Sequence, residues 1–405
     1  MVWTANKLIT ISRRVMKQLS KMMLAAVASV ALAAPAFAWD FSASGSSSAT
    51  FKQATVAPAE GDATTTANFT SSAGGVTVSS SNSDGANSAT FSYTADWNGD
   101  AGNFDEYVSV SGSKKVGNWT ASSSTSQYMQ KDVTAGAQPM TAGGTAAITL
   151  TDGSITYKLG DAAHLSTAEK TSGGPMAGAQ DAEARVDSFN GFSVGMGVGP
   201  GTLTVALDMH SGATHTFLGE TMKVGDVAAG DTATACGGQM TGFGLNFSGD
   251  VGADLSFTYG SGSATMSTNT CTGDNSTNAA SASTMGLGVG IPVGDITIAI
   301  DYEASSYAAT AEKAEIKKDN SGFELSVTMP IGDATAGVNI SSNATKVGAT
   351  TAAGVSAETE VTTAGTEAWY TVPIGAASLS VGYGSSAVGE GTTTTEIGAE
   401  MSMSF

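Results

Sequence analysis

The stretch Phe323-Glu-Leu-Ser-Val-Thr-Met-Pro-Ile331 decides the fold. Every odd position in it is apolar, whereas small, polar or charged residues such as Glu324 fall between them. The same alternation runs through residues 296–303 and 203–209. A period of two places one set of side chains on each face of an extended strand, while the 3.6-residue period of a helix would scatter them around its axis. The chain is therefore predicted to be all-β.

Short connections and long polar segments alternate along the chain. A Pro-Val-Gly or Pro-Ile-Gly element links two alternating runs three times, at residues 292–294, 330–332 and 373–375. Turns of this composition join neighbouring antiparallel strands. Longer polar segments separate these hairpins, at residues 210–238, 262–283, 306–320 and 346–365. The pattern predicts an up-and-down antiparallel sheet with tight turns at one end and long loops at the other.

The N-terminal 38 residues have the pattern of a secretory signal peptide. Basic residues precede an apolar run at residues 22–34, which is followed by Ala36-Phe37-Ala38. This run is shorter than the about 20 residues that a membrane-spanning helix needs. We therefore expect residues 1–38 to be a signal peptide, with residues 1–15 as an over-called start, and residues 39–405 to form the mature protein.

The mature chain is strongly acidic and poor in cations. The whole sequence has 36 acidic and 17 basic residues, a formal net charge of −19, and five of the basic residues precede residue 22. Residues 39–405 therefore carry a net charge of −24, with Arg185 as their one arginine. So few cations cannot neutralise nucleic-acid phosphates, and we expect no nucleic-acid partner. The 51 glycines and 13% charged residues also disfavour a soluble α/β enzyme.

The apolar face of the predicted strands must meet either lipid or a second protein layer. The opposite face is small or polar in strand after strand, and no helical pattern supplies a covering layer. The export signal and the strict alternation up to Phe405 favour lipid. A sheet in lipid must close on itself, because every backbone N–H and C=O needs a partner. The sequence thus predicts a transmembrane antiparallel β-barrel of the outer-membrane type, with short periplasmic turns and long external loops.

The preferred strand count is 16. Eleven strands follow residue 190, two hairpins cover residues 104–128 and 145–160, and one strand lies near residues 40–51. Residues 57–97 hold further alternating pieces, which as an extra pair of strands would make 18. A secreted or surface-attached β-rich adhesin would share this composition and remains the alternative interpretation, although it would need no apolar outward face.

Residues 147–161, Ala-Ile-Thr-Leu-Thr-Asp-Gly-Ser-Ile-Thr-Tyr-Lys-Leu-Gly-Asp, resemble a hairpin of the general diffusion porins of Gram-negative outer membranes, especially the alphaproteobacterial type. In that family the hairpin leads into an inward-folded third loop, 11 strands follow, and the chain ends in phenylalanine. The resemblance implies a water-filled channel in outer-membrane lipid for passive diffusion of small hydrophilic solutes. It also implies a constriction loop at residues 161–189, a homotrimer, and recognition of the strand ending at Phe405 by the barrel assembly machinery.

Charged residues in the expected loop and on the inward faces are the candidate pore-lining residues. The loop candidates are Asp161, Asp181, Glu183, Arg185 and Asp187. Inward positions carry one base, Lys158, against seven acids, namely Asp208, Asp254, Asp301, Glu303, Glu324, Glu396 and Glu400. Acidic linings concentrate cations, so a cation-preferring channel is predicted. The plainer interpretation is that each carboxylate only solvates the polar face. Porin constrictions usually set a row of arginines against the acidic loop, and here only Arg185 is present.

The remaining candidates carry no catalytic chemistry. Cys236 and Cys271 both lie in long polar segments of an exported chain, so a disulfide between them is expected. Acidic loops could hold Ca²⁺ through oxygen ligands, but no EF-hand spacing is present, and we assign no metal site and no cofactor. His164, His210 and His215 match no metal-binding or catalytic spacing. No nucleophile motif or phosphate-binding loop occurs, and we expect no enzymatic activity.

Overall fold

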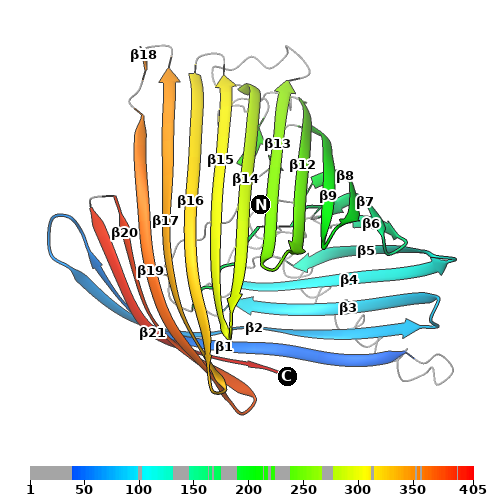
Figure 1. Cartoon of the computed structure of the whole chain (residues 1–405), viewed down its shortest axis with the longest axis horizontal. Coiled ribbons are helices and arrows are strands. Elements are labelled where there is room, and N and C mark those ends of the chain that lie inside the picture. Colours follow the sequence, from blue (N-terminus) through cyan, green and yellow to red (C-terminus); the bar gives the residue numbers. More distant parts are fainter. Residues whose placement is uncertain are drawn as a thin grey trace, which may run out of the picture.

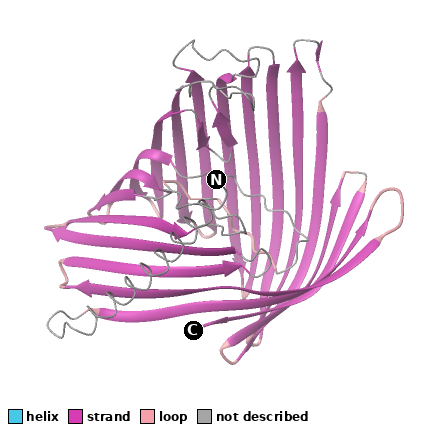
Figure 2. Cartoon of the chain, turned by 180° about the vertical axis from the view of Figure 1, so that it is seen from behind, coloured by secondary structure: helices cyan, strands magenta, loops and turns pink. Residues whose placement is uncertain are grey.

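The computed structural model is a barrel built of strands and their connections (Figure 2). Nowhere in the ranges that it describes is there a helix long and apolar enough to cross a membrane. The described residues are 39–98, 103–130, 146–162, 164–166, 168–174, 189–212, 214–217, 220–223, 238–266, 277–311, 314–351, 354–355, 358–389 and 391–405.

Eighteen strands form one closed antiparallel ring, and three short strands lie outside it. The short ones are the hairpin of β10 (Thr214–Phe217) and β11 (Glu220–Lys223), and β18 (Gly354–Val355), which pairs only with β17. The ring strands are β1 (Asp40–Ala57), β2 (Thr64–Ser83), β3 (Asn87–Asn98), β4 (Asn103–Val116), β5 (Trp119–Gln130), β6 (Ala146–Thr151), β7 (Ile155–Ala162), β8 (Phe189–Val198), β9 (Gly201–Gly212), β12 (Gly238–Asp250), β13 (Asp254–Met266), β14 (Thr277–Val293), β15 (Ile296–Ala311), β16 (Ala314–Ile331), β17 (Ala334–Thr351), β19 (Thr359–Ile374), β20 (Ala377–Val388) and β21 (Thr392–Ser404).

Strands that follow one another in the chain pair with one another around the ring. The two walls formed by β1–β5 and by β12–β17 cross at a steep angle in Figure 1. The ring closes where β1 pairs with β21. There the amide of Gly45 donates to the carbonyl oxygen of Phe405 at 2.8 Å, and the amide of Phe405 donates back at 3.0 Å. The C-terminal residue is therefore part of the closure of the barrel.

One end of the barrel carries eight tight turns of two or three residues. Each turn holds one glycine whose φ lies between +59° and +93°, a backbone region that residues with a Cβ rarely adopt. The three Pro-Val-Gly and Pro-Ile-Gly elements are among these turns. The longest connections, residues 131–145, 163–188 and 213–237, join strands at the other end. The predicted asymmetry of short turns and long loops is confirmed.

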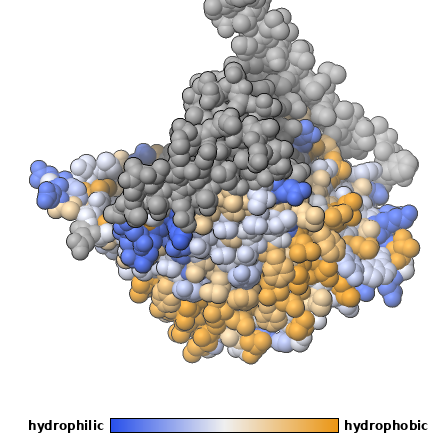
Figure 3. All heavy atoms as spheres, turned by 90° about the horizontal axis from the view of Figure 1, so that it is seen from above, coloured by the Kyte–Doolittle hydropathy of each residue, from blue (hydrophilic) through white to orange (hydrophobic). Residues whose placement is uncertain are grey.

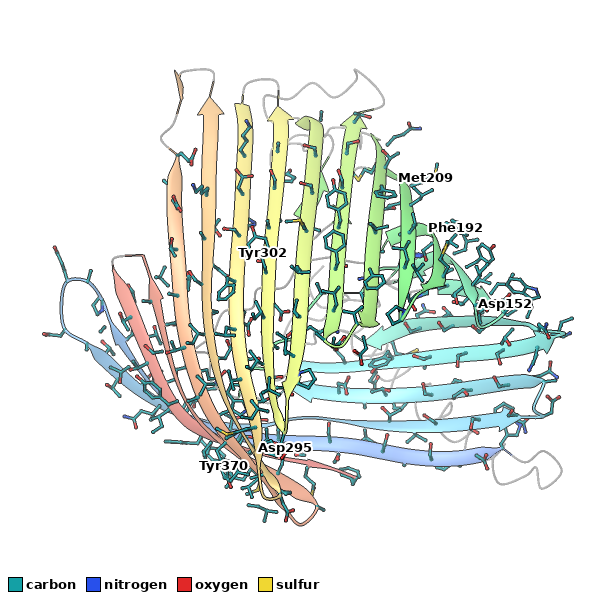
Figure 4. All side chains as sticks on the ribbon, in the orientation of Figure 1. Asp152, Phe192, Met209, Asp295, Tyr302 and Tyr370 are labelled. Atoms are coloured by element: carbon teal, nitrogen blue, oxygen red, sulfur yellow. The ribbon has the colours of Figure 1, made fainter. Side chains whose placement is uncertain are left out.

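The two faces of the sheet are the reverse of those in a water-soluble protein. Large apolar side chains are exposed on the outward face, and Figure 4 labels Phe192, Met209, Tyr302 and Tyr370 among them. Hydrophobic residues gather into a broad band on the surface seen in Figure 3. A closed barrel with a largely apolar exterior satisfies its backbone internally and presents mainly apolar groups to lipid. This is the architecture of a protein of the Gram-negative outer membrane.

The strand count is the higher of the two that the sequence allows. The additional pair is β2 and β3, which occupy most of residues 57–97, and 11 ring strands run from β8 to β21 as predicted. The prediction of a long loop at residues 306–320 is wrong. β15 and β16 continue through this range, and only residues 312–313 join them. The 16 residues of β15 extend about 53 Å. That exceeds a tilted crossing of an apolar band about 25 Å tall, and the outer half of β15 has only small residues, hydroxyl residues and one tyrosine.

Candidate functional site

Residues 164–166 and 168–174, which follow β7, lie across the polar, inner face of the barrel. Their hydrogen bonds reach β12 and β13 first, then β15, β16 and β17, and finally β19. The eight residue steps from Ser166 to Gly174 cover about 26 Å when extended. The five strand spacings from β13 to β19 cover about 24 Å. The segment therefore runs extended and nearly perpendicular to the strands; we call its described residues, 164–166 and 168–174, the crossing segment.

The crossing segment starts from a buried histidine. One ring nitrogen of His164, Nδ1, lies 2.8 Å from the hydroxyl of Ser193 on β8, and the other, Nε2, lies 2.9 Å from the carbonyl oxygen of Gly160 on β7. Both nitrogens thus have partners in the wall. This histidine positions the start of the segment, a role that its spacing from the other histidines did not indicate.

Ser166 attaches the crossing segment to β12 and β13. Its carbonyl oxygen accepts hydrogen bonds from Thr258 Oγ1 at 2.7 Å and from Asn246 Nδ2 at 3.1 Å, and its hydroxyl donates to Asn246 Oδ1 at 3.0 Å. Asn246 and Thr258 are both buried. Buried amide and hydroxyl groups need such partners, so these wall residues are suited to hold a peptide chain.

Asp301 on β15 makes the densest set of contacts with the crossing segment. Its carboxylate accepts the backbone amide of Lys170 at 2.8 and 2.9 Å, the amide of Thr171 at 2.7 Å and the hydroxyl of Thr171 at 2.6 Å. The residue is only 2% exposed. An ionised carboxylate is acceptor-only, which matches a site formed by three donors.

Ser172 continues the attachment on β16 and β17. Its amide donates to Ser326 Oγ at 3.1 Å, and its carbonyl oxygen accepts from Asn339 Nδ2 at 3.3 Å. Asn339 Nδ2 also donates to Glu324 Oε1. Glu324 is therefore linked to the crossing segment through Asn339, and it is buried beneath it.

Gly174 is the last described residue of the crossing segment and lies against β19. Its amide donates to Glu367 Oε2 at 2.8 Å. A Cβ on Gly174 would come within 2.7 Å of the Cβ of Trp369, whose ring lies over Gly337 of β17. Glu367 and Trp369 are buried inner-wall residues that the sequence analysis did not single out.

Three glycines on the inner face of β14 let the crossing segment touch the wall. Gly286, Gly288 and Gly290 alternate with apolar outward residues, and all three are buried. A Cβ on Gly288 would lie 1.6 Å from the carbonyl oxygen of Ala168 and 2.7 Å from Asp301 Oδ1. Alternating glycines on a polar face are a sequence signal of close backbone approach, and they could have located this contact.

The predicted inward acids fall into two groups. Asp208, Asp301 and Glu324 are buried, at 2–3% exposure, and Asp301 and Glu324 lie beneath the crossing segment. The side chain of Asp254 at the start of β13 is 59% exposed, and its two oxygens each lie 3.0 Å from Lys170 Nζ.

The other inward charges lie on β7, β15 and β21. Glu303 and Lys158 are half-buried. Near the closure of the ring, Thr50 Oγ1 donates to Glu400 Oε2 at 3.2 Å, and Lys52 Nζ lies 3.7 Å from Glu396 Oε2. The inward acids therefore do not form one ring around the channel.

Several candidates lie outside the described residues. They are Asp181, Glu183, Arg185, Asp187, Cys236 and Cys271, and of Asp161 only the backbone, in β7, is described. Within the described part of the chain, no group of three or more histidine, cysteine or acidic side chains is arranged to hold a metal ion.

Comparisons with known proteins relate the chain to others through its fold. No protein-family model matches the sequence, and a comparison with curated proteins finds no match. The structure is similar to the outer membrane channel DcaP of Acinetobacter baumannii, with a TM-score of 0.50 and 10% identity over 91% of this chain and 97% of that one. An anion-selective porin from Comamonas acidovorans gives a TM-score of 0.49 and 12% identity over 91% of this chain and 100% of that one. The chain thus has the barrel fold of outer-membrane channels.

Proposed function

We propose that this protein forms a water-filled channel through which small hydrophilic solutes and ions diffuse passively across the outer membrane. The observation that carries the proposal is the crossing segment, which lies along a polar inner wall in a barrel with an apolar exterior. Such a segment narrows a lumen without filling it with apolar side chains. The proposal requires no enzyme chemistry and no cofactor.

We further propose that the channel prefers cations. The acid excess of the chain supports this, as do Glu303 and Glu400, whose side chains are not buried on the inner face. Negative groups along a narrow water-filled path raise the local concentration of cations and lower that of anions. The burial of Asp208, Asp301 and Glu324 removes them from direct contact with the permeating ions, so fewer acids contribute than the sequence suggested.

Recording in a planar lipid bilayer tests both proposals. Purified protein should give discrete conductance steps, and a gradient of potassium chloride should give a reversal potential of the sign expected for cation flow. Absence of steps from correctly folded protein contradicts the channel. Steps with an anion-type reversal potential contradict only the preference for cations.

A homotrimer is the proposed assembly, and the exterior of β5 supports contact between copies. Val110 of β4 pairs with Thr125 of β5, so both share the outward face. Beyond Trp119 at its start, the outward residues of β5 are Ala121, Ser123, Thr125 and Gln127, whereas those of β9 are Leu203, Val205, Leu207 and Met209. Lipid offers no hydrogen bonds to hydroxyl and amide groups, and small residues allow close packing between membrane proteins. A second copy is a better neighbour than lipid for β5.

Insertion by the barrel assembly machinery through the C-terminal strand is also proposed, since Phe405 lies at the closure of the ring. The secreted adhesin is less favoured, because a secreted protein gains nothing from an apolar exterior. Extraction distinguishes the two functions: the channel requires detergent, and the adhesin would leave the cell surface in buffer.

A further inference from the structure

Lys170 divides its contacts between two wall carboxylates. Its backbone amide donates to Asp301 on β15, but its side chain extends to Asp254 on β13. The ammonium nitrogen is 3.0 Å from each oxygen of Asp254. The Lys170 side chain is 18% exposed and that of Asp254 is 59% exposed, so the pair borders the water of the lumen.

The Lys170 ammonium group is not needed to hold the crossing segment. Asp301 takes its hydrogen bonds from the backbone of Lys170 and from Thr171, and Ser166, Ser172 and Gly174 hold the segment on either side. All these contacts use backbone atoms or other side chains. An ion pair whose carboxylate is open to water adds little to stability. The contribution of the ammonium group is therefore its charge.

We propose that Lys170 is a selectivity-determining residue that neutralises Asp254 at the channel wall and thereby limits the preference of the channel for cations. This inference rests on the proposed channel function. In a chain with 36 acids, a lysine on the crossing segment that pairs with an exposed inward carboxylate removes one negative charge from the permeation path.

The size of the effect follows from simple electrostatics. A unit charge about 7 Å from a passing ion in 0.1 M salt raises the concentration of one ion sign and lowers that of the other, which changes the ratio of cation to anion permeability by about two- to three-fold. Salt screens this interaction, because the Debye length falls from about 10 Å at 0.1 M to about 3 Å at 1 M. A charge effect should therefore be large in dilute salt and nearly vanish in concentrated salt, whereas a change of pore shape would persist in both.

Four variants of the full-length protein test the assignment in planar bilayers at 0.1 M and 1 M potassium chloride. Lys170→Met should raise the permeability ratio of potassium to chloride about two- to three-fold at 0.1 M, because Asp254 becomes unpaired. Asp254→Asn should lower it by a similar factor, because the lysine charge is then uncompensated. The double variant Lys170→Met/Asp254→Asn should return close to the wild-type ratio.

Lys346→Met is the matched control. Lys346 also has an acidic partner, Glu360 at 3.4 Å, but it lies on the outward side of β17 and away from the lumen. Its loss should leave the ratio unchanged. A wild-type protein that conducts, combined with no shift in Lys170→Met and Asp254→Asn, overturns the inference and leaves the channel function intact. Equal shifts at both salt concentrations also overturn it, whereas a wild-type protein without conductance contradicts the proposed function itself.

Discussion

The amide and the hydroxyl of Thr171 both donate to one oxygen of Asp301, at 2.7 and 2.6 Å, across 130 residues of sequence. The amide of Lys170 donates to the same carboxylate. These contacts fix the middle of the crossing segment to β15. A carboxylate that was expected to line the pore is thus one of the groups that hold the crossing segment against the pore wall.

Asp301→Asn should loosen the crossing segment. The asparagine NH₂ group would face amide donors, and one buried donor left without a partner costs about 1–3 kcal/mol. We expect the band of the folded barrel on a gel to shift to the unfolded position at a lower temperature than in the wild type. Single channels should show larger current fluctuations.

Asp295→Asn is the control for Asp301→Asn, because Asp295 is exposed in the turn between β14 and β15, far from the crossing segment (Figure 4). It removes the same charge and should leave both measurements unchanged. Identical behaviour of the two variants would mean that the Asp301 contacts do not hold the segment.

Gly288→Ala should displace the crossing segment from β14. The new Cβ would lie 1.6 Å from the carbonyl oxygen of Ala168, so the backbone of the segment must move away from the wall. The single-channel conductance should change while the barrel still forms. Gly197→Ala on β8 is the control, since its Cβ would meet no atom within 4 Å. Unaltered conductance in Gly288→Ala would contradict the contact.

The period of two was sufficient to predict the barrel, because one apolar and one polar face is a local property of each strand. It also gave the correct face for acids such as Asp254 and Asp301. It could not show which acids are covered, since Asp301 is covered by residues 130 positions away. The alternating glycines of β14 indicated where another segment approaches the wall closely. The same pattern, however, also fits a strand whose inner face has no segment packed against it.

The strand count was harder to fix because the apolar signal is weak in the N-terminal wall. β2 and β3 were seen only as scattered pieces within residues 57–97. After Trp119 the outward face of β5 is small or polar, and the strand was found through its hairpin with β4. The small and polar residues at the outer ends of β15 and β16 were mistaken for a loop, because beyond the apolar band a barrel strand has water on both faces.

Asp152 should give the barrel a small stabilisation that disappears in acid. In the turn between β6 and β7 it accepts the amides of Ile155 and Ser154, both at 2.8 Å (Figure 4). These hydrogen bonds hold the pKa of Asp152 below its ordinary value of 3.8, and the one from the amide of Ile155 has the largest effect. Stabilisation from a lowered pKa is present above the ordinary value and is lost as the pH falls through the folded value.

Urea unfolding of the wild type and Asp152→Asn from pH 7 to pH 2 measures this effect. The difference between the urea midpoints of the two proteins should be constant above about pH 5. It should shrink toward zero as the pH falls below 3.8. Ser154→Ala keeps both amide donors and adds no titrating group, so its difference from wild type should not depend on pH. If the urea midpoints of the wild type and Asp152→Asn still differ at pH 2, the ionisation of Asp152 is not the source of the stabilisation.

A large side chain on the exterior of β5 should prevent trimer formation without preventing the barrel from folding. Ser123→Trp places a bulky but lipid-compatible group where we propose that a second copy packs. We expect the trimer band on an unheated gel to be replaced by a monomer that still shows heat-modified migration.

Val205→Trp on β9 is the matched control, because it adds the same side chain to an outward strand whose neighbours are apolar. It should remain trimeric. If both variants stay trimeric, copies do not meet at β5, and if both become monomeric, the contact surface extends as far as β9, four strands away in the ring. The proposal predicts that Ser123→Trp becomes monomeric while Val205→Trp stays trimeric. Such a result would mean that the outward hydroxyl and amide groups of β5 pack against another copy and not against lipid.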